Sequence, residues 1–108
     1  MKKKNKVSSR RIGLDIGLAM GRFFLNTEDL HYGYWTNSQE ANVQNLAEAQ
    51  EAHSQLIIDH IPDKTKSVLD VGSGSGNLAL KLLNLDYNVD CVIPSEFLAE
   101  QVALKLGN

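Results

Sequence analysis

The residues of this chain best suited to chemistry lie in a glycine-rich run that follows a short apolar segment. Asp70 is followed by Gly72, Gly74 and Gly76 at alternate positions. Glycines after a buried strand let the main chain turn tightly, and they let a ligand approach without meeting a Cβ atom. A helix beginning after such a turn directs its free N–H groups toward the ligand. The run therefore predicts a binding loop for the carboxylate or the polar end of a nucleoside-type cofactor.

Two nucleotide-binding motifs do not match this run. The dinucleotide fingerprint G-x-G-x-x-G requires a third glycine where this chain has Asn77. A phosphate-binding P-loop requires Gly-Lys-Ser/Thr, and no such triplet follows. The spacing Asp70-x-Gly72-x-Gly74-x-Gly76 after an apolar strand instead resembles the first motif of class I S-adenosylmethionine-dependent methyltransferases. The structural alternative is that the glycines only form a tight turn between a strand and a helix.

The resemblance covers residues 30–108 and implies S-adenosylmethionine as the cofactor. It implies an α/β, Rossmann-like methyltransferase fold, in which the glycine loop wraps the methionine end of the cofactor. Asp70 is implied to hold the loop, directly or through a water, toward the amino group of the cofactor. The other implied contacts are close main-chain approach at three glycines and a pocket-lining hydroxyl, at Gly72, Gly74, Gly76 and Ser73.

Recognition of the ribose is where the sequence departs from the family. Relatives have an acidic residue at the end of the second strand, and the matching position here is Ile93. Asp90 lies three residues too early, and its side chain is expected on the face opposite that of Cys91. We assign Ser95 to the cofactor site as a substitute, with Glu96 as the alternative.

An aromatic cluster lies upstream of the glycine loop. Tyr32, Tyr34 and Trp35 belong to the run His31-Tyr32-Gly33-Tyr34-Trp35, which resembles a segment found in small-molecule and lipid-type methyltransferases. There the rings cover the cofactor or shape the substrate mouth, and a sulfonium beside aromatic faces gains cation–π attraction. The alternative is a flap that packs its rings onto the sheet.

Hydrophobic periodicity predicts alternating helices and strands in the second half of the chain. Helices of this length between short strands imply parallel pairing and an α/β layer structure. Asn37 and Glu40 have the spacing of a capping box, and Pro62 ends the helix that they begin. The predicted helices span residues 9–25, 38–59, 78–85 and 96–106, and the predicted strands span residues 67–71 and 89–93.

Three glycines complicate the first predicted helix. Gly13, Gly17 and Gly21 recur at every fourth residue and so share one side of a helix. Interior glycines weaken a helix by about 1 kcal/mol each relative to alanine, and an alternating apolar pattern from Ile12 to Met20 also fits a strand. We expect the helix, with another backbone packed closely against its glycine side.

The element count predicts an incomplete fold. Two parallel strands do not make an independently stable sheet, so we expect the chain to be the N-terminal part of a longer domain or a truncated product. We divide it into a flexible basic tail (1–11), a helical and aromatic flap region (12–65) and the start of the cofactor-binding domain (66–108).

Charge is distributed unevenly along the chain. Six of the 11 basic residues lie in the first 11 positions, whereas residues 12–108 hold five basic and 13 acidic side chains. A basic tail can contact nucleic acid or anionic lipid, but the favoured interpretation is a solvated, frayed terminus. No run of about 20 apolar residues is present for a transmembrane segment. The lone Cys91 fits a reducing compartment, and we expect a cytoplasmic protein.

We therefore expect an S-adenosylmethionine-dependent methyltransferase with a small-molecule or lipid acceptor and no assignable catalytic base. The 108 residues alone are expected to be inactive. The alternative is a non-catalytic, methyltransferase-like interaction module, and nucleic-acid binding is the third choice. We interpret His53 and His60, seven residues apart on one helix, as structural because no cysteine or carboxylate completes a metal set.

Overall fold

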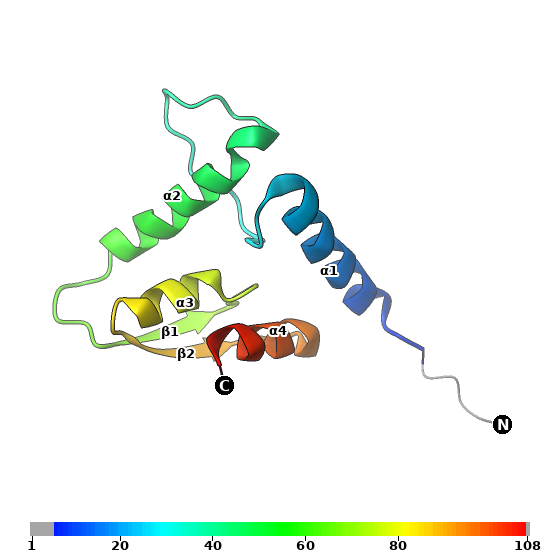
Figure 1. Ribbon diagram of the computed structural model, residues 1–108. Coiled ribbons are helices and arrows are strands. Elements are labelled where there is room, and N and C mark those ends of the chain that lie inside the picture. The colour runs from blue at the N-terminus through cyan, green and yellow to red at the C-terminus, as the bar shows by residue number, and fades with distance from the viewer. Residues whose placement is uncertain (1–5, 108) are drawn as a thin grey trace.

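Helices and strands alternate through the second half of the chain, after an N-terminal region of helices and loops (Figure 1). The computed structural model describes residues 6–107, so Lys2, Lys3 and Lys4 of the basic tail lie outside the described residues. The elements are α1 (Ser9–Met20), the π-helical turn η1 (Gly21–Leu25), the 3₁₀ turn η2 (Val43–Asn45), α2 (Leu46–Asp59), β1 (Ser67–Val71), α3 (Asn77–Asn84), β2 (Asn88–Val92) and α4 (Glu96–Leu106).

The two strands pair in parallel, with Asp70 opposite Cys91 and Val71 opposite Val92. This confirms the predicted α/β class and the predicted parallel pairing, although β2 begins and ends one residue earlier than expected. Side chains alternate between a half-buried face and an exposed face of the pair, as a period of two requires. Asp70 points to the half-buried face, and Asp90 points to the exposed face, as predicted.

The buried residues in the second half of the chain come mainly from helices α3 and α4. Ala79 and Leu82 of α3 and Val102 of α4 are buried. Ser95 caps α4, because its hydroxyl oxygen accepts a hydrogen bond from the main-chain N–H of Leu98. The predicted span of α4 is confirmed, and Gly107 follows it in the left-handed conformation that often ends a helix.

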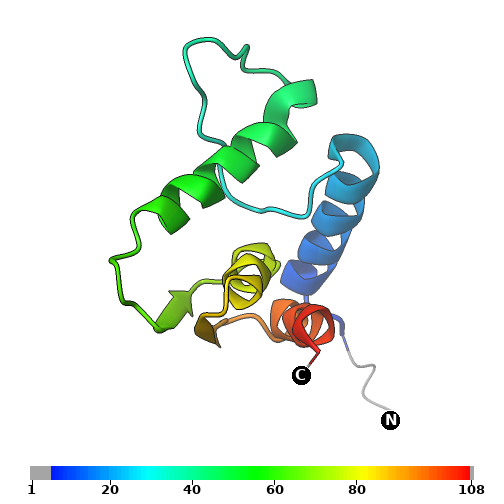
Figure 2. The ribbon, with the colours of Figure 1, turned by 60° about the vertical axis from the view of Figure 1, so that its left-hand side comes forward.

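Helix α1 is attached to this part of the molecule through α4 (Figure 2). Leu18 of α1 packs with Phe97 and Leu98 of α4 in a buried apolar cluster, and Leu14 and Ile93 lie against its edge. The predicted helix is confirmed, with the π-helical turn η1 as its last part. The expected close approach of another backbone to its glycine side is found only at Gly21, where a Cβ would lie 3.0 Å from the main-chain oxygen of Thr27. No atom of residues 6–107 lies where a side chain at Gly13 or Gly17 would begin.

The start of α2 differs from the prediction. The helix begins at Leu46 after the 3₁₀ turn η2, rather than at residue 38. The reason is a competing cap, because the side chain of Asn42 accepts a hydrogen bond from the main-chain N–H of Asn45 at 3.0 Å. The side chain of Asn45 in turn donates to the main-chain oxygen of Glu40 at 2.9 Å. These bonds hold the chain before η2 in a non-helical conformation.

Within residues 6–107, no helix combines the length and the apolar character needed to cross a bilayer.

Gly76, at the start of α3, allows a test of how closely α3 and α4 pack. Its φ of 86° is in the left-handed region, and a Cβ there would lie 3.0 Å from Cγ2 of Val102. Gly76→Ala is therefore expected to lower the free energy of unfolding by about 2–4 kcal/mol, from backbone strain together with overpacking. Urea denaturation measures the change.

The matched control is Gly107→Ala. Gly107 has a φ of 80° but no neighbouring atom where a Cβ would lie. Its substitution adds backbone strain without crowding and is expected to cost only about 1 kcal/mol. Equal losses for the two variants would contradict the close packing of Val102 on Gly76.

Candidate functional site

The glycine loop connects the carboxyl end of β1 to the first turn of α3. Gly72 and Gly74 have φ angles of 74° and 56°, which residues other than glycine rarely adopt. The main-chain N–H of Gly72 donates to the oxygen of Val92 at 2.8 Å, and this bond fastens the loop to the end of β2. The hydroxyl of Ser73 donates to the main-chain oxygen of Asp70 at 2.8 Å. The loop is thus held by a main-chain bond to the end of β2 and by the Ser73 hydroxyl.

A cavity of about 330 Å³ lies against this loop. A Cβ at Gly72 would meet no atom of the described residues within 4 Å, and one at Gly74 would meet only Leu30 Cδ1 at 3.9 Å. The lining comes from three parts of the chain, namely the segment 29–31, helix α2 and the loop with the start of α3. The glycine loop is therefore open on the side that faces the cavity.

Asp70 lines this cavity and has one buried side-chain oxygen without a partner. Its Oδ2 is buried and accepts no hydrogen bond from any of residues 6–107. Burial raises the pKa of the Asp70 carboxyl, and the neighbouring Ser73 hydroxyl offsets only part of that effect. A buried acceptor without a donor is costly to a folded protein. Oδ2 therefore has an unused hydrogen-bond acceptor capacity in a residue that lines the cavity.

The segment that forms the opposite wall, residues 27–31, is held on α2 by a single amide side chain. Gln50 is 3% exposed. Its Oε1 accepts a hydrogen bond from the Thr27 hydroxyl at 2.7 Å. Its Nε2 donates to the main-chain oxygens of Asp29 at 3.2 Å and His31 at 2.8 Å. The position of the wall therefore depends on Gln50.

Two histidines line the cavity side by side. The rings of His31 and His53 are stacked, with centroids 4.6 Å apart. Nδ1 of His31 lies 2.8 Å from the main-chain oxygen of Tyr32, so Nδ1–H donates there, and in the neutral ring the lone pair is then on Nε2. That Nε2 lies 3.7 Å from Oδ1 of Asp29. Nδ1 of His53 is buried and has no hydrogen-bond partner within residues 6–107.

A chain of polar contacts connects this wall to the ends of α3 and α4. Nδ2 of Asn77 donates to Oδ1 of Asp29 at 2.9 Å. The Lys105 ammonium donates to Oδ1 of Asn77 at 2.7 Å and also pairs with Glu28. The Lys105 hydrogen bond, with help from Arg22, holds the pKa of Glu28 below its ordinary value despite partial burial. The segment 27–31 is thus anchored by charge as well as by Gln50.

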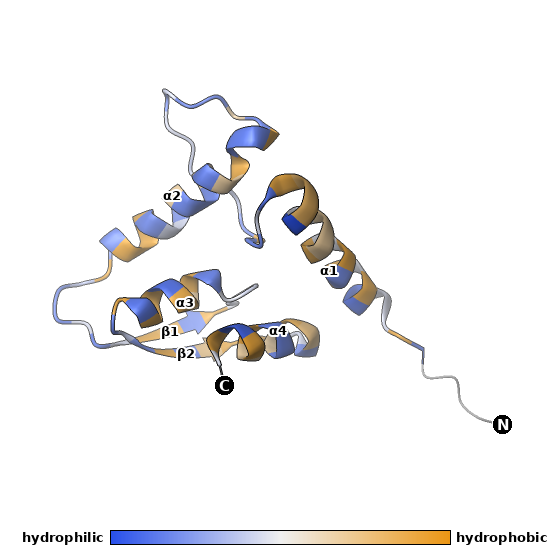
Figure 3. Ribbon diagram, in the orientation of Figure 1, coloured by the Kyte–Doolittle hydropathy of each residue, from blue (hydrophilic) through white to orange (hydrophobic). Residues whose placement is uncertain are grey.

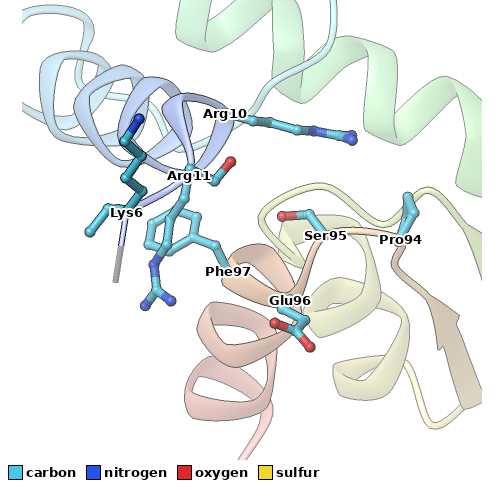
Figure 4. A pocket seen from close by; sticks show the side chains of 9 residues that line it. Lys6, Arg10, Arg11, Pro94, Ser95, Glu96 and Phe97 are labelled. Atoms are coloured by element: carbon cyan, nitrogen blue, oxygen red, sulfur yellow. The ribbon is translucent and has the colours of Figure 1, made fainter. Parts of the chain in front are cut away.

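Ser95 lies in a different cavity from the glycine loop. A space of about 630 Å³ opens beyond β2, between α4 and the start of α1 (Figure 4). In that view Arg10 extends from α1 toward Ser95 and Pro94. The guanidinium of Arg11 is on the other side of this space, 5.7 Å from the ring centre of Phe97. Ser95 and Asp70, both assigned to the cofactor from the sequence, therefore line separate cavities.

The Ile93 side chain is apolar and does not provide a group for the ribose. It packs against the buried cluster of Leu18, Phe97 and Leu98. The Ser95 hydroxyl is used in capping α4. Glu96, the alternative to Ser95, lines the same cavity as Ser95 beyond β2.

The aromatic trio is near the site but does not line the glycine-loop cavity. Tyr32 is 91% exposed and Tyr34 is 48% exposed. The main-chain N–H of Tyr34 donates to the oxygen of Ala49 at 2.7 Å, so the segment is held on α2 rather than on the sheet. Trp35 is half-buried. From this cluster only His31 lines the cavity.

Sequence reasoning missed Asp29, His31, His53 and Asn77 as members of one cluster. We expected His53 to be structural, and its buried ring nitrogen without a partner among residues 6–107 was not predicted. Polar residues next to the aromatic cluster were the available signal. The sequence did not indicate that these residues lie near the glycine loop, because this depends on how residues 27–31 run across α2.

Searches against protein families and against curated proteins give no match to this chain. The function must therefore be argued from the site itself.

Proposed function

We propose that this chain carries the cofactor-binding loop of a class I S-adenosylmethionine-dependent methyltransferase with a Rossmann-like fold. The observation that supports the proposal most strongly is the unpartnered Oδ2 of Asp70 beside an open glycine loop at the carboxyl end of β1. Ligands of open α/β sheets bind at this edge of the strands. The acceptor is proposed to be a small molecule or a lipid.

The donor set fits this cofactor chemically. S-adenosylmethionine has a cationic amino group and a carboxylate at its methionine end. A buried carboxylate oxygen without a donor suits the first of these groups. The first turn of α3, preceded by Gly76 with no side-chain cap, suits the second. When bound, S-adenosylmethionine supplies an electrophilic methyl group on a sulfonium.

Each residue of the loop has a separate proposed task. Asp70 accepts the hydrogen bond from the amino group, and Ser73 holds the turn through the main-chain oxygen of Asp70. Gly72 and Gly74 admit the cofactor to the main chain, because nothing projects from them. Ser95 is proposed to contact the ribose end, which requires the cofactor to extend from the glycine loop to the carboxyl end of β2.

The second candidate function is a non-catalytic module that keeps the methyltransferase-like architecture. The packing of Ile93 in the apolar cluster favours it, since that position has no group for the ribose hydroxyls. Tyr32, Tyr34 and Trp35 are then interaction residues rather than a cover for a cofactor.

An NMR titration of the ¹⁵N-labelled 108-residue chain distinguishes the two. S-adenosylmethionine is expected to cause saturable shifts of the main-chain amides of Gly72, Gly74 and Leu78, all of which line the cavity. NAD is the comparison ligand, because the loop lacks the third glycine of the dinucleotide fingerprint. Absence of shifts at the loop, or an equal response to NAD, would overturn the proposal and favour the non-catalytic module.

A further inference from the structure

A second cavity, largely apolar, lies on the other side of the segment 27–31. It has a volume of about 280 Å³ and is enclosed by α1, η1, the 27–30 segment and the start of α2. Its apolar lining is formed by Leu18, Met20, Phe24, Leu25, Leu30 and Leu46. Figure 3 shows the mainly hydrophobic character of α1 and η1. A dry cavity of about 150 Å³ already binds benzene, so this one has room for a ring with a short substituent.

The glycine pattern of α1 accounts for the space. Gly17 and Gly21 both line this cavity, whereas Gly13 does not. A Cβ at Gly17 would meet no neighbouring atom within 4 Å. Met20 and Phe24 are 53% and 67% exposed, so the cavity has an opening to solvent. The missing side chain at position 17 thus leaves room that a ligand can occupy.

The polar end of the cavity is acidic. Glu28 and Asp29 are the charged residues in its lining. Glu28 is already paired with Arg22 and Lys105. Asp29, 11% exposed, has no such cation, because within residues 6–107 only the His31 ring comes within ion-pair distance. Asp29 is therefore complementary to an additional positive charge.

We propose that this cavity binds the methyl acceptor, and that the acceptor is a small apolar amine with its nitrogen at Asp29. The inference rests on the proposed function, because the apolar cavity is assigned to the acceptor on account of the residues that it shares with the glycine-loop cavity. Asp29 and Leu30 line both spaces. An amine at Asp29 would therefore be next to the cavity proposed for the methyl donor.

The transfer can be written with His31 as the base. The bound ammonium gives one proton to Nε2 of His31, which has a free lone pair and lies 3.7 Å from the Asp29 carboxylate. S-adenosylmethionine, held at Asp70 and the glycine loop, would supply the methyl group for an N–C bond to this nitrogen, and its S–C bond would break with both electrons left on sulfur. The products are the methylated ammonium and a neutral thioether. Asp29 stabilises the protonated imidazole until solvent removes the proton.

Binding of phenethylamine and 2-phenylethanol to the 108-residue chain tests the inference. These probes have the same apolar body and differ in charge at neutral pH. The amine is expected to bind at least about tenfold more tightly than the alcohol, because its hydrogen bond to Asp29 is charge-assisted. In Asp29→Asn the preference is expected to disappear. Equal affinity of the unmodified chain for both probes would overturn the proposed amine specificity.

The place of binding is tested by two leucine substitutions on α1. Gly17→Leu fills the cavity and is expected to weaken phenethylamine binding at least about tenfold, whereas Gly13→Leu leaves it unchanged. Both substitutions replace a helical glycine that has free space beside it, so their effects on the helix are alike. Equal effects of the two on binding would overturn the assignment to this cavity.

Amide shifts in the unmodified chain check the same point without a variant. Phenethylamine is expected to shift the amides of Gly17, Gly21 and Gln50, which line the apolar cavity, and to leave that of Ser95, which lines the cavity beyond β2, unchanged. A shift of Ser95 without shifts of Gly17, Gly21 and Gln50 would overturn the inference.

The two proposals fail separately in these experiments. If phenethylamine binds at Asp29 but S-adenosylmethionine does not bind the glycine loop, the proposed function fails and the amine site remains. If S-adenosylmethionine binds but neither probe does, the acceptor site is wrong and the proposed function remains.

Discussion

Asp70→Asn is expected to make the protein more stable at neutral pH while weakening its binding of S-adenosylmethionine at least about tenfold. The stability gain follows from the removal of a negative charge whose Oδ2 is buried without a hydrogen-bond donor. The loss of affinity follows because an amide replaces the carboxylate proposed to accept the amino group of the cofactor. Urea denaturation and calorimetric titration measure the two effects.

The pH dependence of stability gives a further readout of Asp70. Because burial raises its pKa in the folded protein, the folded state holds the proton more tightly than the unfolded state does. The contribution of Asp70 to stability is therefore fully present below the unfolded pKa, at about pH 4. It is lost as the pH rises through the folded pKa. In Asp70→Asn this decline is expected to be absent.

Asp90→Asn is the matched control, since Asp90 is on the exposed face of the neighbouring strand. It is expected to change neither the pH profile nor the affinity. Loss of stability in Asp70→Asn at neutral pH, or equal behaviour of the two variants, would contradict the assignment of Asp70.

Gln50→Leu is expected to lower the free energy of unfolding by about 3–5 kcal/mol. The substitution removes all three hydrogen bonds of the buried amide. It leaves the Thr27 hydroxyl and the main-chain oxygens of Asp29 and His31 without this partner. Chemical denaturation measures the loss. Binding of both S-adenosylmethionine and phenethylamine is expected to weaken in the folded variant, because the segment 27–31 loses its anchor.

The control for this variant is Gln55→Leu on the same helix. Gln55 is exposed, and its side chain donates only to the Asp59 carboxylate, one turn away. Its replacement is expected to change the free energy of unfolding by less than about 0.5 kcal/mol. If Gln50→Leu costs no more than Gln55→Leu, Gln50 is not the anchor of the segment.

The parts of the fold that follow local rules were predictable from the sequence. The β-branched run from Ser67 to Val71 forms the expected strand, and α4 spans residues 96–106 as its apolar stripe indicated. The left-handed glycines of the loop are also local, because only their backbone freedom is needed. The predicted start of α2 was wrong because two capping signals lie a few residues apart in the sequence. The second, Asn42, is the one that makes the cap hydrogen bond.

The composition of the candidate site was less predictable, because it depends on contacts between distant segments. Asp29 and Asn77 are 48 residues apart and meet through a hydrogen bond. Their meeting requires Gln50 to hold the segment 27–31 on α2, and Gln50 is a polar residue with no distinguishing pattern around it. Nor could the sequence indicate that Ser95 and Asp70 would line separate cavities.

The segment 27–31 lies between the two cavities, and two of its residues, Asp29 and Leu30, line both. A molecule that immobilises this partition from one side lowers the entropic cost of binding on the other. Thermodynamic linkage makes the benefit reciprocal, so that each ligand raises the affinity of the other by the same factor. The proposed methyl donor and acceptor are therefore expected to bind cooperatively, so that the complex with both ligands is more populated than the two separate affinities predict.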